Sequence, residues 1–121
     1  MNRTTPSPIN DHVADLKREA RRLETADDLD GAWRALADAH ILSQPWPRPH
    51  VAVHAAMFGL AWRTRSRQEL AGQAFRILVA APGSIAGRYP IGNSGRSDVS
   101  AFEPASVPDH LAAILAKEGV R

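Results

Sequence analysis

The sequence predicts an all-α protein of two antiparallel helical hairpins, stacked in the manner of tetratricopeptide repeats, with a long ordered loop and a short C-terminal helix after them. Three observations support this prediction. Apolar residues recur at spacings of three and four along residues 9–81, which is the period of amphipathic helices. Alanine, the strongest helix former, is abundant. Very short links join the first predicted helix to the second and the third to the fourth, so each pair is expected to fold back on itself.

The first predicted hairpin carries one apolar stripe on each helix. We expect Asn10 or Asp11 to cap the first helix and Thr25 to cap the second, because short polar side chains accept hydrogen bonds from the free amides of a first turn. The stripe of the first helix contains Ile9, Val13, Leu16, Ala20 and Leu23. The stripe of the second helix contains Leu29, Trp33, Leu36 and His40, which directs His40 toward the core.

The second predicted hairpin follows a proline-rich link. Three prolines within residues 44–49 remove backbone donors and hold the chain extended, so the third helix is expected to begin at Arg48 or Pro49. Ser66, with Glu69 three residues later, matches a capping box for the fourth helix, which is predicted to end at Pro82–Gly83. The expected core stripes are Val51, Ala55, Phe58 and Trp62 on the third helix and Leu70, Ala74 and Ile77 on the fourth, with His50, His54, Met57 and Ala61 on an adjacent stripe.

Residues 83–107 differ in character from the rest of the chain, because they are rich in Gly, Ser and Pro and lack periodicity. A loop of this length in a small domain is functional, ordered by packing, or disordered. Its scattered apolar residues predict that it packs across the helices: Ile85, Tyr89, Ile91, Val99 and Phe102. A last helix is expected over 108–118. The whole chain is thus predicted to be one domain, with four helices over 9–81 and a flexible N-terminus over 1–8.

The composition excludes several classes of function. The chain has 121 residues, enough for one domain with a real core. It contains no cysteine, so thiolate ligands and disulfides are impossible. The net charge is only +2 and the basic residues are interleaved with acidic ones, so nucleic-acid binding is not expected. Without a signal-peptide pattern or an apolar run near the ~20 residues that span a bilayer, we expect a cytoplasmic protein that does not contact membranes.

The histidine pattern is the strongest chemical signal. His50 and His54 are four residues apart and therefore share one helix face, which is half of a transition-metal site. His40 and Glu69, each on a neighbouring helix, are candidates to complete it. Imidazole and carboxylate donors suit Zn²⁺, Ni²⁺, Cu²⁺ or non-haem iron. The protein is then a transition-metal-binding protein or a metal-dependent enzyme, and no residue is assigned a catalytic role.

A second interpretation uses the same side chains without a metal. Buried imidazoles require hydrogen-bond partners, and a polar network could fix how the two hairpins dock. The network would contain His40, Gln44, His54, Glu69 and Gln73, and Asn93 in the turn Gly92–Gly95 could add backbone amides that bind an anion. The protein is then a small binding or accessory module for an unknown protein or small ligand. The sequence also favours a homodimer, because two stacked hairpins leave an apolar edge.

Several spaced motifs resemble those of one known family, the small bacterial proteins grouped as domain of unknown function 3703. The motifs lie between His40 and the C-terminus and are Ala39-His-Ile-Leu-Ser-Gln44, His50-x-x-x-His54-x-x-Met57, Glu69-x-x-Gly72-Gln-x-x-Arg76-Ile77 and Gly87-x-x-Pro90-x-Gly-Asn-Ser-Gly95. The resemblance implies an all-helical single domain. It implies no activity, because the family has no established one, and therefore no site residue is carried over from it.

Overall fold

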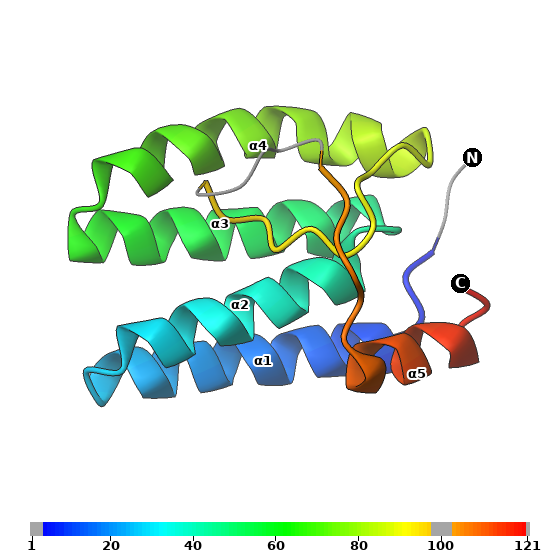
Figure 1. Ribbon diagram of the computed structural model, residues 1–121, viewed down its shortest axis with the longest axis horizontal. Helices are drawn as coiled ribbons and strands as arrows, with labels where there is room; N and C mark the ends of the chain where they lie inside the picture. The colour runs from blue at the N-terminus through cyan, green and yellow to red at the C-terminus, as the bar shows by residue number, and fades with distance from the viewer. Residues whose placement is uncertain (1–3, 98–102, 121) are drawn as a thin grey trace.

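The computed structural model describes residues 4–97 and 103–120. Over these residues the chain is helical, with loops between the helices and no strand. The helices are α1 (Ser7–Thr25), α2 (Leu29–Ser43), α3 (Pro47–Thr64), α4 (Arg67–Ile85) and α5 (Asp109–Lys117). Figure 1 shows them lying nearly parallel to one another, with α5 at one end of the molecule. None of these helices is long and apolar enough to cross a membrane.

The helices form two hairpins that stack on each other. α1 packs on α2, α3 packs on α4, and α2 joins the hairpins by packing on α3 (Figure 1). α5 closes the open end of α2, where Leu111 and Leu115 enter the core. The predicted all-α class, the two hairpins and the short C-terminal helix are therefore confirmed, whereas the closer likeness to tetratricopeptide repeats stays a prediction.

The first hairpin is held by the predicted apolar stripe of α1. All five residues of that stripe are buried in the core or packed against it. The predicted caps of α1 and α2 are wrong. α1 begins at Ser7 with Pro6 as its N-cap residue, so the expected caps Asn10 and Asp11 lie inside the helix. Pro8 in the first turn suits this start, because its φ is already helical and its missing amide would have no partner there. Asp28 caps α2 by accepting a hydrogen bond from the Gly31 amide, while the Thr25 hydroxyl donates to the Arg21 carbonyl inside α1.

The second hairpin turns a different face inward from the predicted one. On α3, Ala55 and Trp62 are exposed and the buried stripe is the histidine-bearing one, with Met57 and Ala61 fully buried. On α4, the predicted seam is at most half-buried and the buried residues are Glu69, Gln73, Arg76, Ala80 and Ser84. The prediction placed the apolar stripes of both helices inside. It named the wrong faces because the interior between α3 and α4 is polar.

α4 does not end at Pro82, as the sequence predicted, but continues to Ile85. Proline removes one backbone hydrogen-bond donor, but the loss of a single bond near the C-terminal end of α4 does not prevent one further helical turn. That turn is closed by a Schellman motif around Gly87, whose φ is +68°: the Gly87 amide donates to the Ser84 carbonyl and the Arg88 amide to the Gly83 carbonyl. The extra turn places Ser84 in the interior.

The segment after α4 packs across the helices, as predicted, but through its backbone rather than through the expected apolar side chains. Ile85 and Ile91 are 55% and 46% exposed, while Gly92, Asn93 and Gly95 are buried. Val99 and Phe102, which were also expected to pack, lie outside the described residues. Figure 1 shows the segment in yellow and orange crossing α3 and α2 toward α5.

Candidate metal centre

Three imidazoles meet where the two hairpins join. His40 lies in the last turn of α2, His50 in the first turn of α3, and His54 one turn further along α3. Only Gln44, Pro45 and Trp46 separate the two helices, so the chain reverses sharply and brings the rings together. The ring centroids of the three pairs lie 4.6–5.0 Å apart, and all three side chains are buried.

A hydrogen bond fixes each ring through its Nδ1 atom. His40 Nδ1 lies 2.7 Å from the Asn93 carbonyl oxygen, which can only accept, so Nδ1 donates. His54 Nδ1 lies 2.6 Å from Gln73 Oε1, and the Gln73 amide group donates to the Gly95 carbonyl, which leaves Oε1 as acceptor. Each of these two rings therefore carries its proton on Nδ1.

The third ring is fixed in the same way by the added turn of α4. Ser84 donates its hydroxyl proton to the Gln44 carbonyl at 2.5 Å. The Ser84 oxygen is then an acceptor for His50 Nδ1, which lies 2.7 Å away. His50 is thereby the third Nδ1-protonated imidazole.

The opposite nitrogens converge. The Nε2 atom of His40 lies 3.0 Å from that of His54 and 3.1 Å from that of His50, and one ligand nitrogen from each residue lies within 4.8 Å of the others. With each proton on Nδ1, these Nε2 atoms present lone pairs to one another. Three hydrogen-bond acceptors in contact cannot satisfy one another's lone pairs. A cation bound among the three nitrogens would accept all three lone pairs.

Burial keeps these rings neutral. It lowers the pKa of His50 to about 3 and that of His54 to about 4, and it holds the pKa of His40 well below its usual value. The neighbouring imidazoles lower the pKa of His40 and of His50 further, though less than burial does. The positive charge of Arg76 also lowers the pKa of His40 and of His54. Neutral imidazole is the form that binds metals, so no proton has to leave at neutral pH.

The segment after α4 supplies the remaining contacts of the cluster through backbone carbonyls. The Asn93 carbonyl accepts from His40, the Gly95 carbonyl from Gln73, and the Pro90 carbonyl from the Gln44 side chain. Asn93 also shapes its own turn, since its side chain accepts from the Gly95 amide and donates to the Glu103 carbonyl. The predicted binding residues Gln44, Gln73 and Asn93 thus surround the imidazoles.

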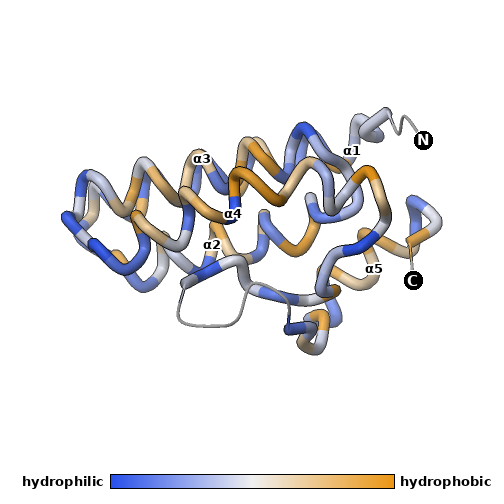
Figure 2. The backbone as a smooth tube through the Cα atoms, turned by 90° about the horizontal axis from the view of Figure 1, so that it is seen from above, coloured by the Kyte–Doolittle hydropathy of each residue, from blue (hydrophilic) through white to orange (hydrophobic). Residues whose placement is uncertain are grey.

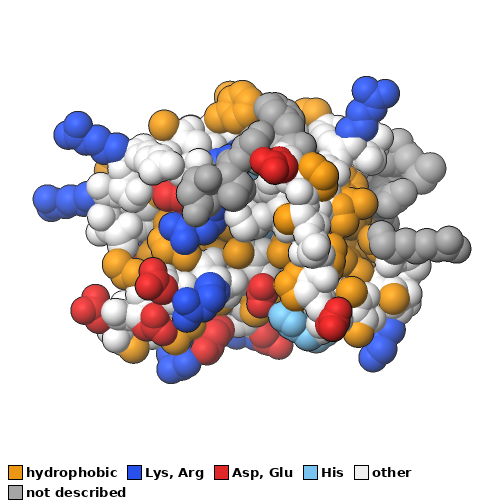
Figure 3. All heavy atoms as spheres, in the orientation of Figure 1, with side chains coloured by type: hydrophobic (Ala, Val, Ile, Leu, Met, Phe, Trp, Pro, Cys, Tyr) orange, Lys and Arg blue, Asp and Glu red, His pale blue; other side chains and the backbone are white. Residues whose placement is uncertain are grey.

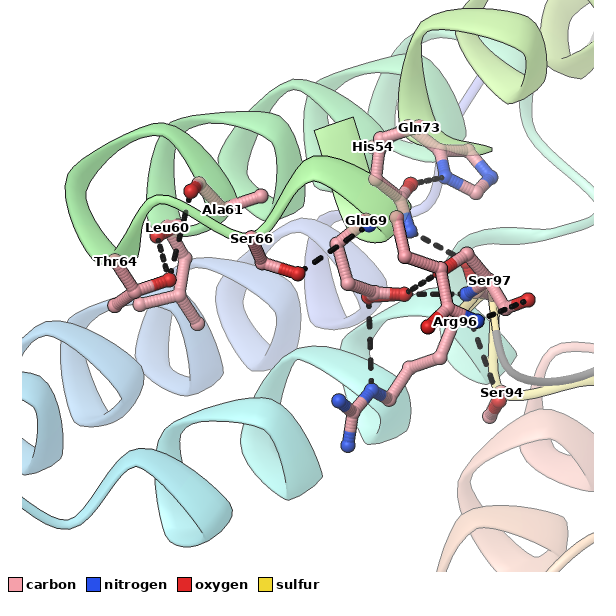
Figure 4. A network of polar contacts seen from close by, with 12 residues as sticks. His54, Leu60, Ala61, Thr64, Ser66, Glu69, Gln73, Ser94, Arg96 and Ser97 are labelled. Carbon is pink, nitrogen blue, oxygen red and sulfur yellow. Dashed lines mark hydrogen bonds and ion pairs between the residues drawn. The ribbon is translucent and has the colours of Figure 1, made fainter. Parts of the chain in front are cut away.

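Glu69 lies apart from the group of close ligand atoms, which over the described residues contains the three histidines. Its carboxylate accepts from the Ser97 amide at 2.5 Å and from the Ser97 hydroxyl, and it pairs with Arg96 at 3.6 Å. Figure 4 shows this network beside the His54–Gln73 hydrogen bond. Arg96 in turn lies over the Trp33 ring, 4.5 Å from its centroid. Glu69 therefore anchors the segment after α4 on α4.

Sequence reasoning missed two parts of the site. It did not find Ser84, because the helix was expected to end at Pro82. It did not find the carbonyl acceptors of Pro90 and Gly95, since any residue carries a carbonyl and only the folded segment decides which one faces a side chain. The available signal was the turn Gly92–Gly95, whose two glycines adopt φ of +78° and +80°.

A cavity of about 360 Å³ opens onto the cluster. All three imidazoles border it, together with Arg76 and the start of the segment after α4. The remaining wall is largely apolar and includes Val79, Ala80, Pro82, Tyr89 and Pro90. A ligand in this cavity can reach the centre of the three rings.

The fold and the site define a class: an all-α, two-hairpin protein whose interior holds a buried three-histidine cluster. The chain belongs to the family described as protein of unknown function (DUF3703), whose family model matches residues 8–115. The match is longer than the resemblance noted from the motifs and includes the first hairpin. No curated protein and no solved structure matches the chain.

Proposed function

We propose that this protein binds one transition-metal ion through the Nε2 atoms of His40, His50 and His54. The observation that carries the proposal is the common orientation of the rings: each donates from Nδ1 to a protein acceptor and turns its lone pair to the other two. Metal-binding histidines have this arrangement, because a partner on the second nitrogen fixes the ring and raises its basicity.

The spacing of the nitrogens supports an ion of first-row size. Zinc–imidazole bonds of 2.0–2.1 Å in a tetrahedral site separate two ligand nitrogens by about 3.3 Å. The separations of the His40 Nε2 atom from those of His54 and His50, 3.0 and 3.1 Å, lie within a few tenths of an ångström of that value. The ligand nitrogens of all three residues lie within 4.8 Å of one another, so an ion bound to all three would draw the remaining pair, His50 and His54, together.

The donor set favours Zn²⁺ and the neighbouring divalent ions Ni²⁺, Cu²⁺ and Fe²⁺ over Mg²⁺ or Ca²⁺, because neutral imidazoles suit the former and oxygen ligands the latter. Three protein ligands leave a fourth position open, which is the pattern of catalytic rather than structural zinc sites. The cavity beside the rings gives that position access to a small molecule.

Metal analysis of the full chain, purified without a histidine tag, tests the proposal. We expect one equivalent of ion and a higher melting temperature on adding Zn²⁺, since a ligand at 100 times its Kd stabilises the fold by about 2.7 kcal/mol. His54→Gln should remove binding, whereas the exposed histidine His12, changed to Gln, should leave it intact. The metal-binding proposal is overturned if the purified protein holds less than about a tenth of an equivalent of transition metal and its melting temperature does not rise with Zn²⁺, Ni²⁺ or Cu²⁺.

A second candidate function is that of a binding module that forms a homodimer. The surface that supports it is the outer face of α4. Phe75, Leu78 and Ile85 are 47%, 76% and 55% exposed and recur at helical spacing. In Figure 2 hydrophobic segments recur along α4, and in Figure 3 hydrophobic side chains gather at the upper edge of the molecule, where α4 lies. Exposed apolar stripes of this kind support protein contacts.

Sedimentation of wild type and Leu78→Glu tests this candidate. A dimer that dissociates on the substitution supports it, because a buried charge at an apolar contact is costly. A monomeric wild type at all concentrations contradicts it. His54→Gln serves as the control, since it lies in the interior and should not change the oligomeric state.

A further inference from the structure

We infer that the protein hydrolyses small uncharged carboxylic esters: the held ion turns a bound water into hydroxide, and the cavity beside the three histidines holds the ester. The inference deepens the proposed function and rests on it, because the ion is what activates the water.

The surroundings of the ion site leave the fourth ligand position to water. Three imidazoles provide the protein ligands, and Glu69 lies apart from them with its carboxylate engaged by Ser97 and Arg96. Among the described residues, the cavity lining contains no Asp or Glu to fill the position instead. A zinc ion with three protein ligands completes its coordination with water or substrate. All three imidazoles border the cavity, so this water can be reached from it.

The hydrogen bonds on the outer side of the rings favour an acidic bound water. Each Nδ1 donates to an uncharged acceptor, which is the Asn93 carbonyl, the Ser84 hydroxyl oxygen or the Gln73 amide oxygen. A carboxylate in these places would make the imidazoles stronger donors to the ion. With neutral ligands and neutral partners the ion keeps most of its charge, and protein-bound zinc of this kind lowers the pKa of its water to about 7. Hydroxide then forms at neutral pH without a carboxylate base.

The cavity favours a small carboxylic ester over a phosphate ester. Val79, Ala80 and Pro82 are part of its largely apolar wall, and its volume of about 360 Å³ falls in the ~300–1,000 Å³ range of small-molecule sites. Phosphate esters are typically cleaved between two metal ions. The group of close ligand atoms, over the described residues, contains three histidines and suits one ion. A neutral ester with a compact hydrocarbon body matches both features.

The reaction balances with water as the co-reactant. The bound water releases its proton to solvent through the open side of the cavity, and the hydroxide adds to the carbonyl carbon of the ester. The C–O bond to the leaving group then breaks, its electron pair leaves with the alcohol oxygen, and solvent protonates that oxygen. A new water takes the vacated position on the ion. One ester and one water give one carboxylate, one alcohol and one proton.

The test uses the full chain loaded with one equivalent of Zn²⁺, and p-nitrophenyl acetate is the probe ester. At pH 7.5 we expect repeated turnover at least about tenfold faster than with the same concentration of free Zn²⁺, because water on aqueous zinc has a pKa of about 9. Removal of Zn²⁺ with a chelator should abolish the turnover. p-Nitrophenyl phosphate has the same leaving group and should react no faster than it does with free Zn²⁺.

The full chain loaded with Co²⁺ gives a second measurement that does not depend on turnover, because the visible spectrum of Co²⁺ reports its coordination. Loss of a proton from the bound water should change the spectrum with a single pKa of about 7. Ester turnover by the Zn²⁺ protein should rise with pH over the same range and then level off.

Three variants locate the ester in the cavity. Val79 is half-buried and lines the cavity, so Val79→Trp should fill part of it. We expect kcat/KM to fall by at least about tenfold, because a displaced substrate reacts slowly, while the Zn²⁺ content stays at one equivalent. Ala86→Trp, at the exposed mouth of the cavity, should act in the same way and serves if Val79→Trp does not fold. Ala74→Trp, an exposed change on the same helix outside the lining, is the matched control.

The outcomes separate this inference from the metal proposal. Bound Zn²⁺ without turnover above that of free Zn²⁺, or bound Co²⁺ without a pH-dependent spectrum, overturns the hydrolysis inference alone. Wild-type turnover by the folded Val79→Trp or Ala86→Trp variant overturns the cavity as the ester site, and faster cleavage of the phosphate ester overturns the substrate class. Absence of bound metal overturns the metal proposal and this inference together.

Discussion

The Nε2 atoms of His40 and His54 lie 3.0 Å apart, and both rings carry their protons on the opposite nitrogen. Two lone pairs at this separation repel each other, and His50 adds a third at 3.1 Å from His40. The three acceptors on Nδ1 come from two elements: α4 supplies Ser84 and Gln73, and the segment after it supplies the Asn93 carbonyl. The arrangement therefore depends on the complete fold, and the predictions below concern the parts that maintain it.

Ser84→Ala is expected to weaken metal binding by about tenfold to a hundredfold, because it removes the acceptor that orients His50. It should also lower the free energy of unfolding by about 1 kcal/mol, since the Gln44 carbonyl loses its donor. Competition with a chromophoric chelator and urea unfolding measure the two effects. Ser7→Ala, at the exposed start of α1, is the control, and equal metal affinities for the two variants would remove Ser84 from the site.

Gly95→Ala is expected to displace His40. A methyl group on Gly95 would lie 2.6 Å from two ring carbons of His40, and the residue has a φ of +80°, which disfavours any side chain. We expect a stability loss above about 1 kcal/mol and a metal affinity at least about tenfold lower.

Gly87→Ala separates the two causes. Gly87 has a comparable φ of +68° but nothing within 4 Å of an added methyl group. It should show the stability loss due to backbone strain and keep wild-type metal affinity. If both glycine variants reduce metal affinity alike, the contact between Gly95 and His40 is not what holds the ring.

The metal-free protein is expected to lose stability as pH falls from about 6.5 toward 3. The pKa of His50 is lowered to about 3 and that of His54 to about 4, from 6.5 when unfolded. Between these values the unfolded chain binds more protons than the folded one, so acid favours unfolding, while stability is fully retained above 6.5.

Urea unfolding in the presence of a chelator, at pH 7.5, 5.5 and 4.5, measures this dependence. His54→Gln, which removes one of the buried rings, should make this dependence shallower. A free energy of unfolding that stays constant from pH 7.5 to 5.5 would contradict the buried, neutral state of the rings.

Glu24 and Arg63 link the hairpins outside the site. Arg63 on α3 donates to both carboxylate oxygens of Glu24 on α1, at 2.7 and 2.9 Å, and this hydrogen bonding lowers the pKa of Glu24. Because the pair is partly exposed, its coupling should stay below about 1 kcal/mol. It should be present above the unfolded pKa of 4.5 and fade as pH falls through the lowered folded value. A double-mutant cycle with Glu24→Gln and Arg63→Gln measures it, and equal coupling at pH 7 and pH 3 would contradict the assignment.

Local chemistry was sufficient to predict the helices. The stripe that begins at Ile9 is apolar at every third or fourth position, and the Ser66 hydroxyl oxygen accepts from the Glu69 amide as the capping pattern predicted. The spacing of His50 and His54 likewise placed two rings on one face, because helix geometry requires it. These features depend on residues within one or two turns of each other, so the sequence alone determined them.

Tertiary structure decided which faces of α3 and α4 point inward and which groups surround the histidines. Trp62 is 68% exposed although its spacing suggested a core position, because burying the His50–His54 face turned it outward. Ser84 reached His50 only because the Gly87 Schellman motif closed a turn beyond Pro82. The Asn93 carbonyl meets His40 across 53 positions of sequence. Such contacts form only when the two hairpins and the loop together satisfy their buried polar groups. A local sequence pattern contains no information about these long-range contacts.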